Sequence, residues 1–203
     1  MGNYPVEEFE AQVRCEEPTM TKRHTTTIYP YCDCDKPVTD FLYRNWLVLG
    51  RGPEPLMRGD RTAEYVVMKD YEVIVVVGGE YHTIVVPAGM TTDLASVPRI
   101  FRGLVGQTGP HLEACIVHDW LYIAWQIQDR LPTKADWKFA NQVLYAGMKA
   151  AGCSWFTRMA VKVAMKTPFV SWSVFKSRDR NLFVSLEDFR DRHPLPVEEE
   201  YTR

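Results

Sequence analysis

The sequence lacks any long hydrophobic run. Its apolar stretches, such as Val73 to Val77, are far shorter than the roughly 18 residues that a membrane-spanning helix needs. The first residues, Met1 to Glu8, have neither the basic flank nor the apolar core of a secretory signal. We therefore expect a protein without a membrane span that is made in the cytoplasm.

A strong excess of one charge is also missing, because 24 lysines and arginines face 26 acidic residues. No global field draws such a protein onto nucleic acid or an anionic membrane. Any contact with nucleic acid would have to come from a local basic patch.

Cysteines are few and scattered, with five in 203 residues. Such an odd and dispersed set excludes a disulfide-stapled secreted scaffold, and we expect reduced thiols. Cys32 and Cys34, with His24 nearby, are the one pair that could hold zinc, but no second cysteine pair follows. The alternative interpretation of this pair is an exposed loop.

The composition is sufficient for one core, since 46% of the residues are hydrophobic. We predict an α+β fold with a small antiparallel β-sheet, about three α-helices and extended N- and C-terminal arms. Residues 1–40 are rich in proline and form the expected N-terminal arm. Residues 41–175 form the expected domain, and 176–203 a charged tail.

Alternation and spacing place the elements of this domain. β-branched and aromatic residues between 64 and 86 predict strands, and Gly78-Gly79 predicts a tight hairpin turn. Helical spacing predicts helices over 111–125, from Thr133 to Gly152, and from Ser154 to near Pro168, with a short one at 96–105. Thr133 and Asp136 have the form of a capping box. The third helix is expected to bury Trp155, Phe156, Met159 and Val163.

Three blocks of the sequence resemble a known family. They are Val86-Pro87-Ala88-Gly89-Met90-Thr91-Thr92-Asp93-Leu94-Ala95-Ser96-Val97-Pro98-Arg99, then Val117-His118-Asp119-Trp120-Leu121-Tyr122, then Lys134-Ala135-Asp136 with Phe139. In order and spacing, residues 62–168 are similar to domain of unknown function 1353. That family occurs in bacteriophage genomes and prophages, often near tail and lysis genes, and the resemblance implies no defined activity.

Polar residues inside these blocks are the candidate catalytic set: Asp93, His118, Asp119 and Asp136. Among them, Asp93, His118 and Asp119 are the candidate ligands of a divalent metal such as zinc, because His-Asp pairs are typical of metal-dependent hydrolases. The alternative is a structural network. In that case Asp93 forms a turn or pairs with Arg99, Asp136 caps Thr133, and His118 and Asp119 are partnered within the core.

A second possible metal site lies along the first long helix. His111, Cys115 and His118 follow one another at four and then three residues, which places them on one helical face. The alternative is that Cys115 is a small core side chain, which is the more frequent role of such a cysteine.

Two further patterns predict interaction surfaces. Arg158, Lys162 and Lys166 repeat every four residues within a stretch, 137–178, that contains no acid. They form either a solvated face or a docking stripe for an acidic protein patch or phosphates. In the tail, Phe183, Leu186 and Phe189 form an apolar island that docks either on its own domain or on a neighbouring subunit.

The preferred functional hypothesis is a phage virion or tail-associated structural protein that docks on neighbouring subunits through its arms. Its partners would be other virion or tail proteins, and it would pass from the host cytoplasm into the particle. The alternative is a metal-dependent hydrolase that acts on the bacterial cell wall during entry or lysis.

Overall fold

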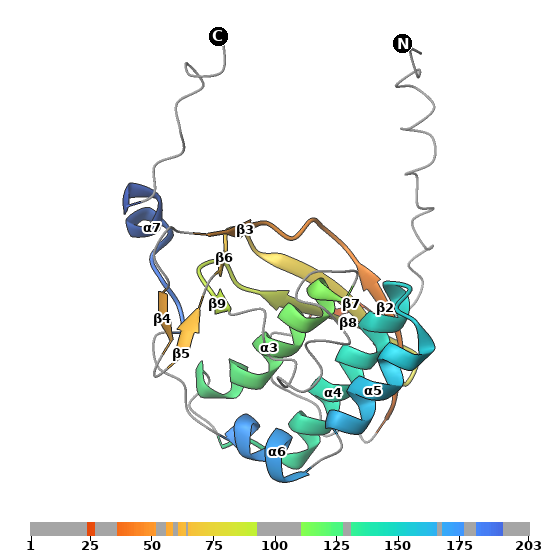
Figure 1. The fold of residues 1–203 in the computed structure, drawn as a ribbon. Coiled ribbons are helices and arrows are strands. Elements are labelled where there is room, and N and C mark those ends of the chain that lie inside the picture. The colour runs from red at the N-terminus through yellow and green to blue at the C-terminus, as the bar shows by residue number, and fades with distance from the viewer. Residues whose placement is uncertain are drawn as a thin grey trace, which may run out of the picture.

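The computed structural model describes residues 24–26, 36–51, 56–58, 61–63, 65–92, 111–127, 131–165, 168–176 and 182–192. The predicted α+β class is confirmed. In Figure 1 the main sheet forms one layer, and helices α3 (Leu112–Ile127), α4 (Lys134–Ala150) and α5 (Trp155–Met165) lie on one side of it. No described helix has the length and apolar character that a membrane span requires.

A β-hairpin forms the centre of this sheet. Strand β7 (Tyr71–Val77) pairs antiparallel with β8 (Glu80–Val86), as the sequence predicted. Gly78 and Gly79 have φ angles of 59° and 87°, which glycine tolerates at no steric cost in a tight turn. Every second residue of β7 is buried, so one face of the hairpin lies against the helices.

The full order of the main sheet is β1-β8-β7-β2. Strand β2 (Val38–Tyr43) runs antiparallel to β7, whereas β1 (His24–Thr26) runs parallel to β8. The sequence did not predict β1, which falls inside the segment interpreted as an unstructured arm. A strand of only three residues has no alternation by which it could be recognised.

Two smaller sheets complete the β structure. Strands β3 (Leu49–Gly50), β6 (Tyr65–Val67) and β9 (Thr91–Thr92) form one antiparallel sheet, and β4 (Leu56–Arg58) pairs with β5 (Arg61–Ala63) in the other. Strand β9 follows the hairpin and lies within the first sequence block that resembles the family. This strand therefore brings that block close to the core.

The first two helices pack closely together. Helix α4 begins at the predicted capping box, in which the Thr133 side chain accepts from the backbone N–H of Asp136 and the Asp136 carboxylate accepts from that of Thr133. A Cβ atom added at Gly147 would lie 2.7 Å from the Cβ of Ala114, so α3 and α4 approach at a point where only glycine fits.

The core lies between these helices and the hairpin. Its buried members come from β2, β6, β7, β8, α3 and α4 and from the segment between β8 and β9, and include Phe41, Val67, Tyr71, Val73, Val75, Val77, Ile84, Val86, Met90, Ile116, Val117, Trp120, Leu121, Ile123, Ala124, Phe139, Ala140 and Val143. Residues of all three family-like blocks are therefore part of the same core.

Two more helices follow α5. Helix α6 (Pro168–Lys176) packs on α3 through Phe175, whose ring lies 4.9 Å from that of Tyr122 and whose carbonyl accepts from the Trp125 indole N–H at 3.2 Å. Helix α7 (Leu186–Arg192) lies apart, beside the smaller sheets (Figure 1). The predicted short helix at 96–105 lies outside the described residues.

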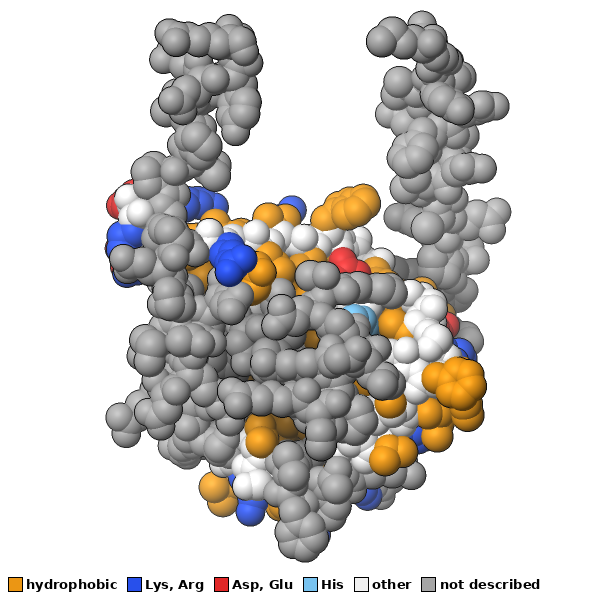
Figure 2. All heavy atoms as spheres, in the orientation of Figure 1, with side chains coloured by type: hydrophobic (Ala, Val, Ile, Leu, Met, Phe, Trp, Pro, Cys, Tyr) orange, Lys and Arg blue, Asp and Glu red, His pale blue; other side chains and the backbone are white. Residues whose placement is uncertain are grey.

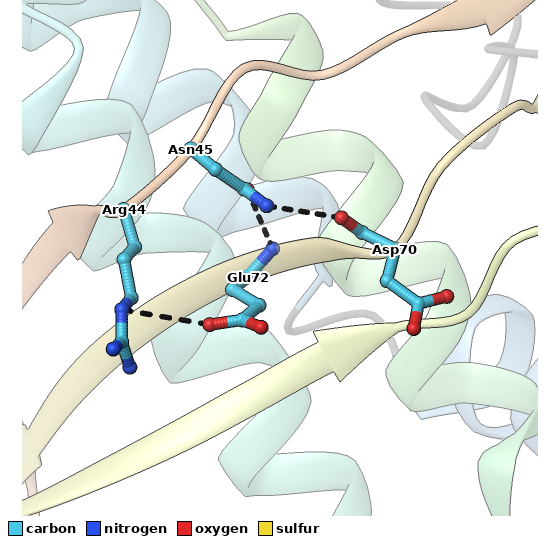
Figure 3. A network of polar contacts seen from close by, with 4 residues as sticks. All are labelled: Arg44, Asn45, Asp70 and Glu72. Atoms are coloured by element: carbon cyan, nitrogen blue, oxygen red, sulfur yellow. Dashed lines mark hydrogen bonds and ion pairs between the residues drawn. The ribbon is translucent and has the colours of Figure 1, made fainter.

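A polar network joins the end of β2 to the start of β7 (Figure 3). The Asn45 side chain donates to the carbonyl of Asp70 at 3.0 Å and accepts from the N–H of Glu72 at 2.8 Å. The Arg44 guanidinium lies 3.5 Å from the Glu72 carboxylate. Asn45 thus continues the pairing of the two strands by a side chain after β2 has ended.

We predict that Asn45→Ala lowers the free energy of unfolding by about 1–2 kcal/mol, because it removes the hydrogen bonds to the Asp70 carbonyl and to the Glu72 N–H. Chemical denaturation of the purified chain measures this change. Lys69→Ala, an exposed position of the adjoining loop, is the control and should change stability by less than about 0.5 kcal/mol. Equal effects of the two substitutions would contradict the role given to Asn45.

Candidate functional site

His118 is buried in α3 and faces helix α4. Its Nε2 lies 3.1 Å from Oδ1 of Asn141, and the Tyr122 hydroxyl donates to the same oxygen at 3.0 Å. The rings of His118 and Tyr122 also contact each other, with centroids 4.0 Å apart. A carbonyl oxygen can only accept, so Nε2 of His118 carries the proton in this arrangement.

Burial lowers the pKa of His118 to about 4, and the hydrogen bond to Asn141 only partly opposes this effect. The imidazole is therefore neutral at neutral pH. It serves as a hydrogen-bond donor that joins two helices, and Asn141, which the sequence did not single out, is its partner. Only the packing of α3 on α4 reveals that residue.

Asp119 points to a different neighbour. The Thr92 hydroxyl of β9 donates to Oδ2 of Asp119 at 3.0 Å, and both residues are buried. Successive helix residues differ by about 100° in direction, which is why His118 reaches α4 while Asp119 reaches the sheet. The first two family-like blocks thus meet at the Thr92–Asp119 bond. Asp93, which follows Thr92, lies outside the described residues.

Asp136 occupies the capping position predicted as the structural alternative. Its Oδ2 accepts from the Thr133 backbone N–H at 3.1 Å and from the Thr133 hydroxyl at 2.7 Å. The carboxylate is buried and fixes the start of α4. Of the proposed catalytic residues that can be placed, His118, Asp119 and Asp136 each have a partner within the fold.

The described residues contain no group of three His, Cys, Asp or Glu side chains that could hold one metal ion. The set His111, Cys115 and His118 is entirely described, so the prediction of a metal site on that helical face is wrong. Cys115 is buried, and burial raises its thiol pKa. A core role explains it better. Cys32, Cys34 and Asp93 lie outside the described part of the chain.

The basic stripe of α5 packs partly on an aromatic ring. The guanidinium carbon of Arg158 lies 5.6 Å from the ring centroid of Tyr145, and Nζ of Lys162 lies 4.9 Å from it. Both distances allow cation–π attraction. Lys166, the third predicted member, lies outside the described residues. The two cations that can be placed are therefore held beside α4.

The apolar island of the tail docks on its own domain, the first of the two predicted alternatives. Phe189 is buried, and its ring lies next to Gly50 of β3. Phe183 packs edge-on against Trp120 at 6.3 Å, and Val184 donates its N–H to Gly89. Leu186 is half-buried at the start of α7. Within this single chain, side chains and backbone groups of the island find partners on the same domain.

Helix α5 corrects one prediction. Trp155, Phe156 and Val163, expected in the core, are 57%, 76% and 61% exposed. The helix instead buries Val161, Ala164 and Met165. Both faces of α5 are apolar, so spacing alone could not tell which one packs on α4.

Comparison with known proteins gives one match. Residues 65–165 match the family described as "Protein of unknown function (DUF1353)", and this segment contains all three family-like blocks. No curated protein and no solved structure matches the chain.

We predict that protonation of His118 destabilises the fold between pH 6.5 and 4. The unfolded imidazole binds a proton near pH 6.5 and the folded one only near pH 4, so stability is lost as the pH falls through this window. The full loss is about 3 kcal/mol. Denaturation at several pH values should show a flatter pH dependence for His118→Gln.

Direct titration supplies the control where that variant does not fold. The His118 ring resonances of the unaltered protein, followed by NMR, should change only below about pH 5. A midpoint near 6.5 would contradict the buried hydrogen bond to Asn141.

Proposed function

We propose that this chain, which carries a domain of unknown function 1353 in residues 65–165, is a structural protein of a bacteriophage virion or tail. It would be made in the host cytoplasm and then join the particle by docking on neighbouring subunits. The proposal rests on an exposed apolar surface of α5 together with the phage association of the family.

The surface consists of Trp155, Phe156 and Val163, which we call the α5 patch. The rings of Trp155 and Phe156 pack edge-to-face with centroids 5.0 Å apart. Hydrophobic side chains gather on the flank of the molecule where α5 lies (Figure 2). Neighbouring exposed aromatic residues are typical of protein interfaces, where tryptophan often contributes most of the binding energy.

Charges beside the α5 patch indicate the character of the partner. Arg158 and Lys162 lie on the same helix, and the sequence from 137 to 178 contains no acid. An apolar centre with a basic rim fits a protein surface with apolar and acidic side chains. Two cations packed on Tyr145 form a weaker case for nucleic acid, which needs several phosphate contacts.

The family-like polar residues support a scaffold rather than a reaction centre. His118 is bonded to Asn141, Asp119 to Thr92 and Asp136 to Thr133. Each bond joins α3 or α4 to its surroundings, and a buried polar group that loses its partner costs about 1–3 kcal/mol. These residues are accounted for by the stability of the domain.

We predict that the double substitution Trp155→Ser and Phe156→Ser abolishes incorporation into phage particles without unfolding the chain, because both side chains are solvent-exposed in the isolated protein. Mass spectrometry of purified particles measures the copy number, and thermal denaturation checks the fold. Leu131→Ser is the control, since Leu131 is 78% exposed and lies before α4, outside the α5 patch.

Three results would overturn the proposal. The unaltered chain could be absent from purified particles, the α5 variant could be incorporated at the normal copy number, or Leu131→Ser could reduce incorporation equally.

A metal-dependent cell-wall hydrolase is the second candidate. The observation in its favour is that Thr92, the residue before Asp93, is bonded to Asp119. This bond brings the first two family-like blocks together. Under the structural proposal we predict less than about 0.1 zinc per purified chain by metal analysis. Stoichiometric zinc that disappears in a folded Asp119→Asn variant would instead favour the hydrolase.

A further inference from the structure

A cavity of about 460 Å³ opens between α4, α5 and the start of β2. Its size is within the range of small-ligand sites in proteins. The residues around it are Pro37, Val38, Trp137, Lys138, Asn141, Gln142, Leu144, Tyr145, Val161, Lys162 and Met165. Asn141, the partner of His118, borders this cavity, and the cavity shares Lys162 with the basic rim of the α5 patch.

The walls of the cavity are largely apolar. Leu144, Val161 and Met165 are buried aliphatic side chains, and Trp137 and Tyr145 add aromatic surface. A ligand that enters this space must therefore have an apolar body, because burial of apolar area is the main gain available there.

The polar groups around the cavity are hydrogen-bond donors. Oδ1 of Asn141 already accepts from His118 and Tyr122, so the amide NH₂ of Asn141 is the group left to donate. Oε1 of Gln142 accepts from the Val38 N–H at 3.0 Å, so the NH₂ of Gln142 is likewise the group left to donate. Two neighbouring amides thus present donors to whatever the cavity holds.

Two cations complete this pattern. Lys138 and Lys162 border the cavity from α4 and α5, and both are exposed. Of the described residues that line it, none is acidic. A site with ammonium and amide donors and no carboxylate favours a ligand that is negatively charged and rich in acceptors.

We propose that this cavity is a binding site for a small anionic amphiphile with an apolar chain and one carboxylate. The chain lies against Leu144, Val161 and Met165. The carboxylate lies at the rim, where Lys138 and Lys162 neutralise it and the amides of Asn141 and Gln142 donate to it. His118 contributes indirectly, because its bond to Oδ1 fixes which way the Asn141 amide is turned.

The test compares three ligands of one chain length, octanoate, octanol and octylammonium, by calorimetric titration of the full chain. We expect octanoate to bind roughly tenfold or more tightly than octanol, since charged hydrogen bonds add to the same apolar burial. Octylammonium should not bind measurably. Equal affinities for octanoate and octanol, or no binding of octanoate, would overturn the proposal.

Variants locate the binding. Gln142→Glu keeps the oxygen that accepts from Val38 but replaces the NH₂ donor by an anion, so it should weaken octanoate binding about tenfold or more while the protein stays folded. Lys138→Glu with Lys162→Glu should do the same. The matched control is Lys134→Glu with Lys149→Glu, two exposed lysines of α4 that do not line the cavity.

The control pair should change affinity less than about threefold, an effect of net charge alone. A loss as large in the control as in the cavity variants would overturn the assignment. So would a synthetic peptide of residues 4–13 that displaces octanoate at lower concentration, because its acidic and aromatic residues (Tyr4, Glu7, Glu8, Phe9 and Glu10) would then be the better occupant.

Discussion

The burial of helix α3 is the constraint on which the rest of the structure depends. Eleven of its sixteen residues are buried, and burial of its imidazole and carboxylate groups is costly unless they are hydrogen-bonded inside the protein. His118 finds Asn141 on α4, and Asp119 finds Thr92 on β9. The two bonds leave α3 in different directions, and together they fix the rotation of this helix between strand β9 and helix α4.

The parts of the fold that depend on neighbours in sequence could be predicted from the sequence. The Gly78-Gly79 turn and the Thr133–Asp136 capping box are set by residues no more than three positions apart, and both have the expected geometry. Strand β1 could not be found this way, because its pairing with β8 joins residues far apart in sequence.

The candidate site was predictable in its residue types but not in its partners. The family-like blocks identified His118, Asp119 and Asp136. In contrast, Asn141 and Thr92 became relevant only through contacts across 23 and 27 residues. Spacing also assigned the wrong face of α5 to the core. Trp155 and Phe156 are as apolar as the residues that pack, and the contact with α4 decides between them.

Strand β1 also determines which backbone groups lie at one border of the main sheet. The backbone of His24–Thr26 pairs with Tyr81–Thr83 along the outer border of the main sheet. An uncovered border strand is a template onto which another polypeptide can add, and it leads to fibrils. Strand β1 is itself the border strand in the order β1-β8-β7-β2, and because it has only three residues it presents a short row of backbone groups to any further strand.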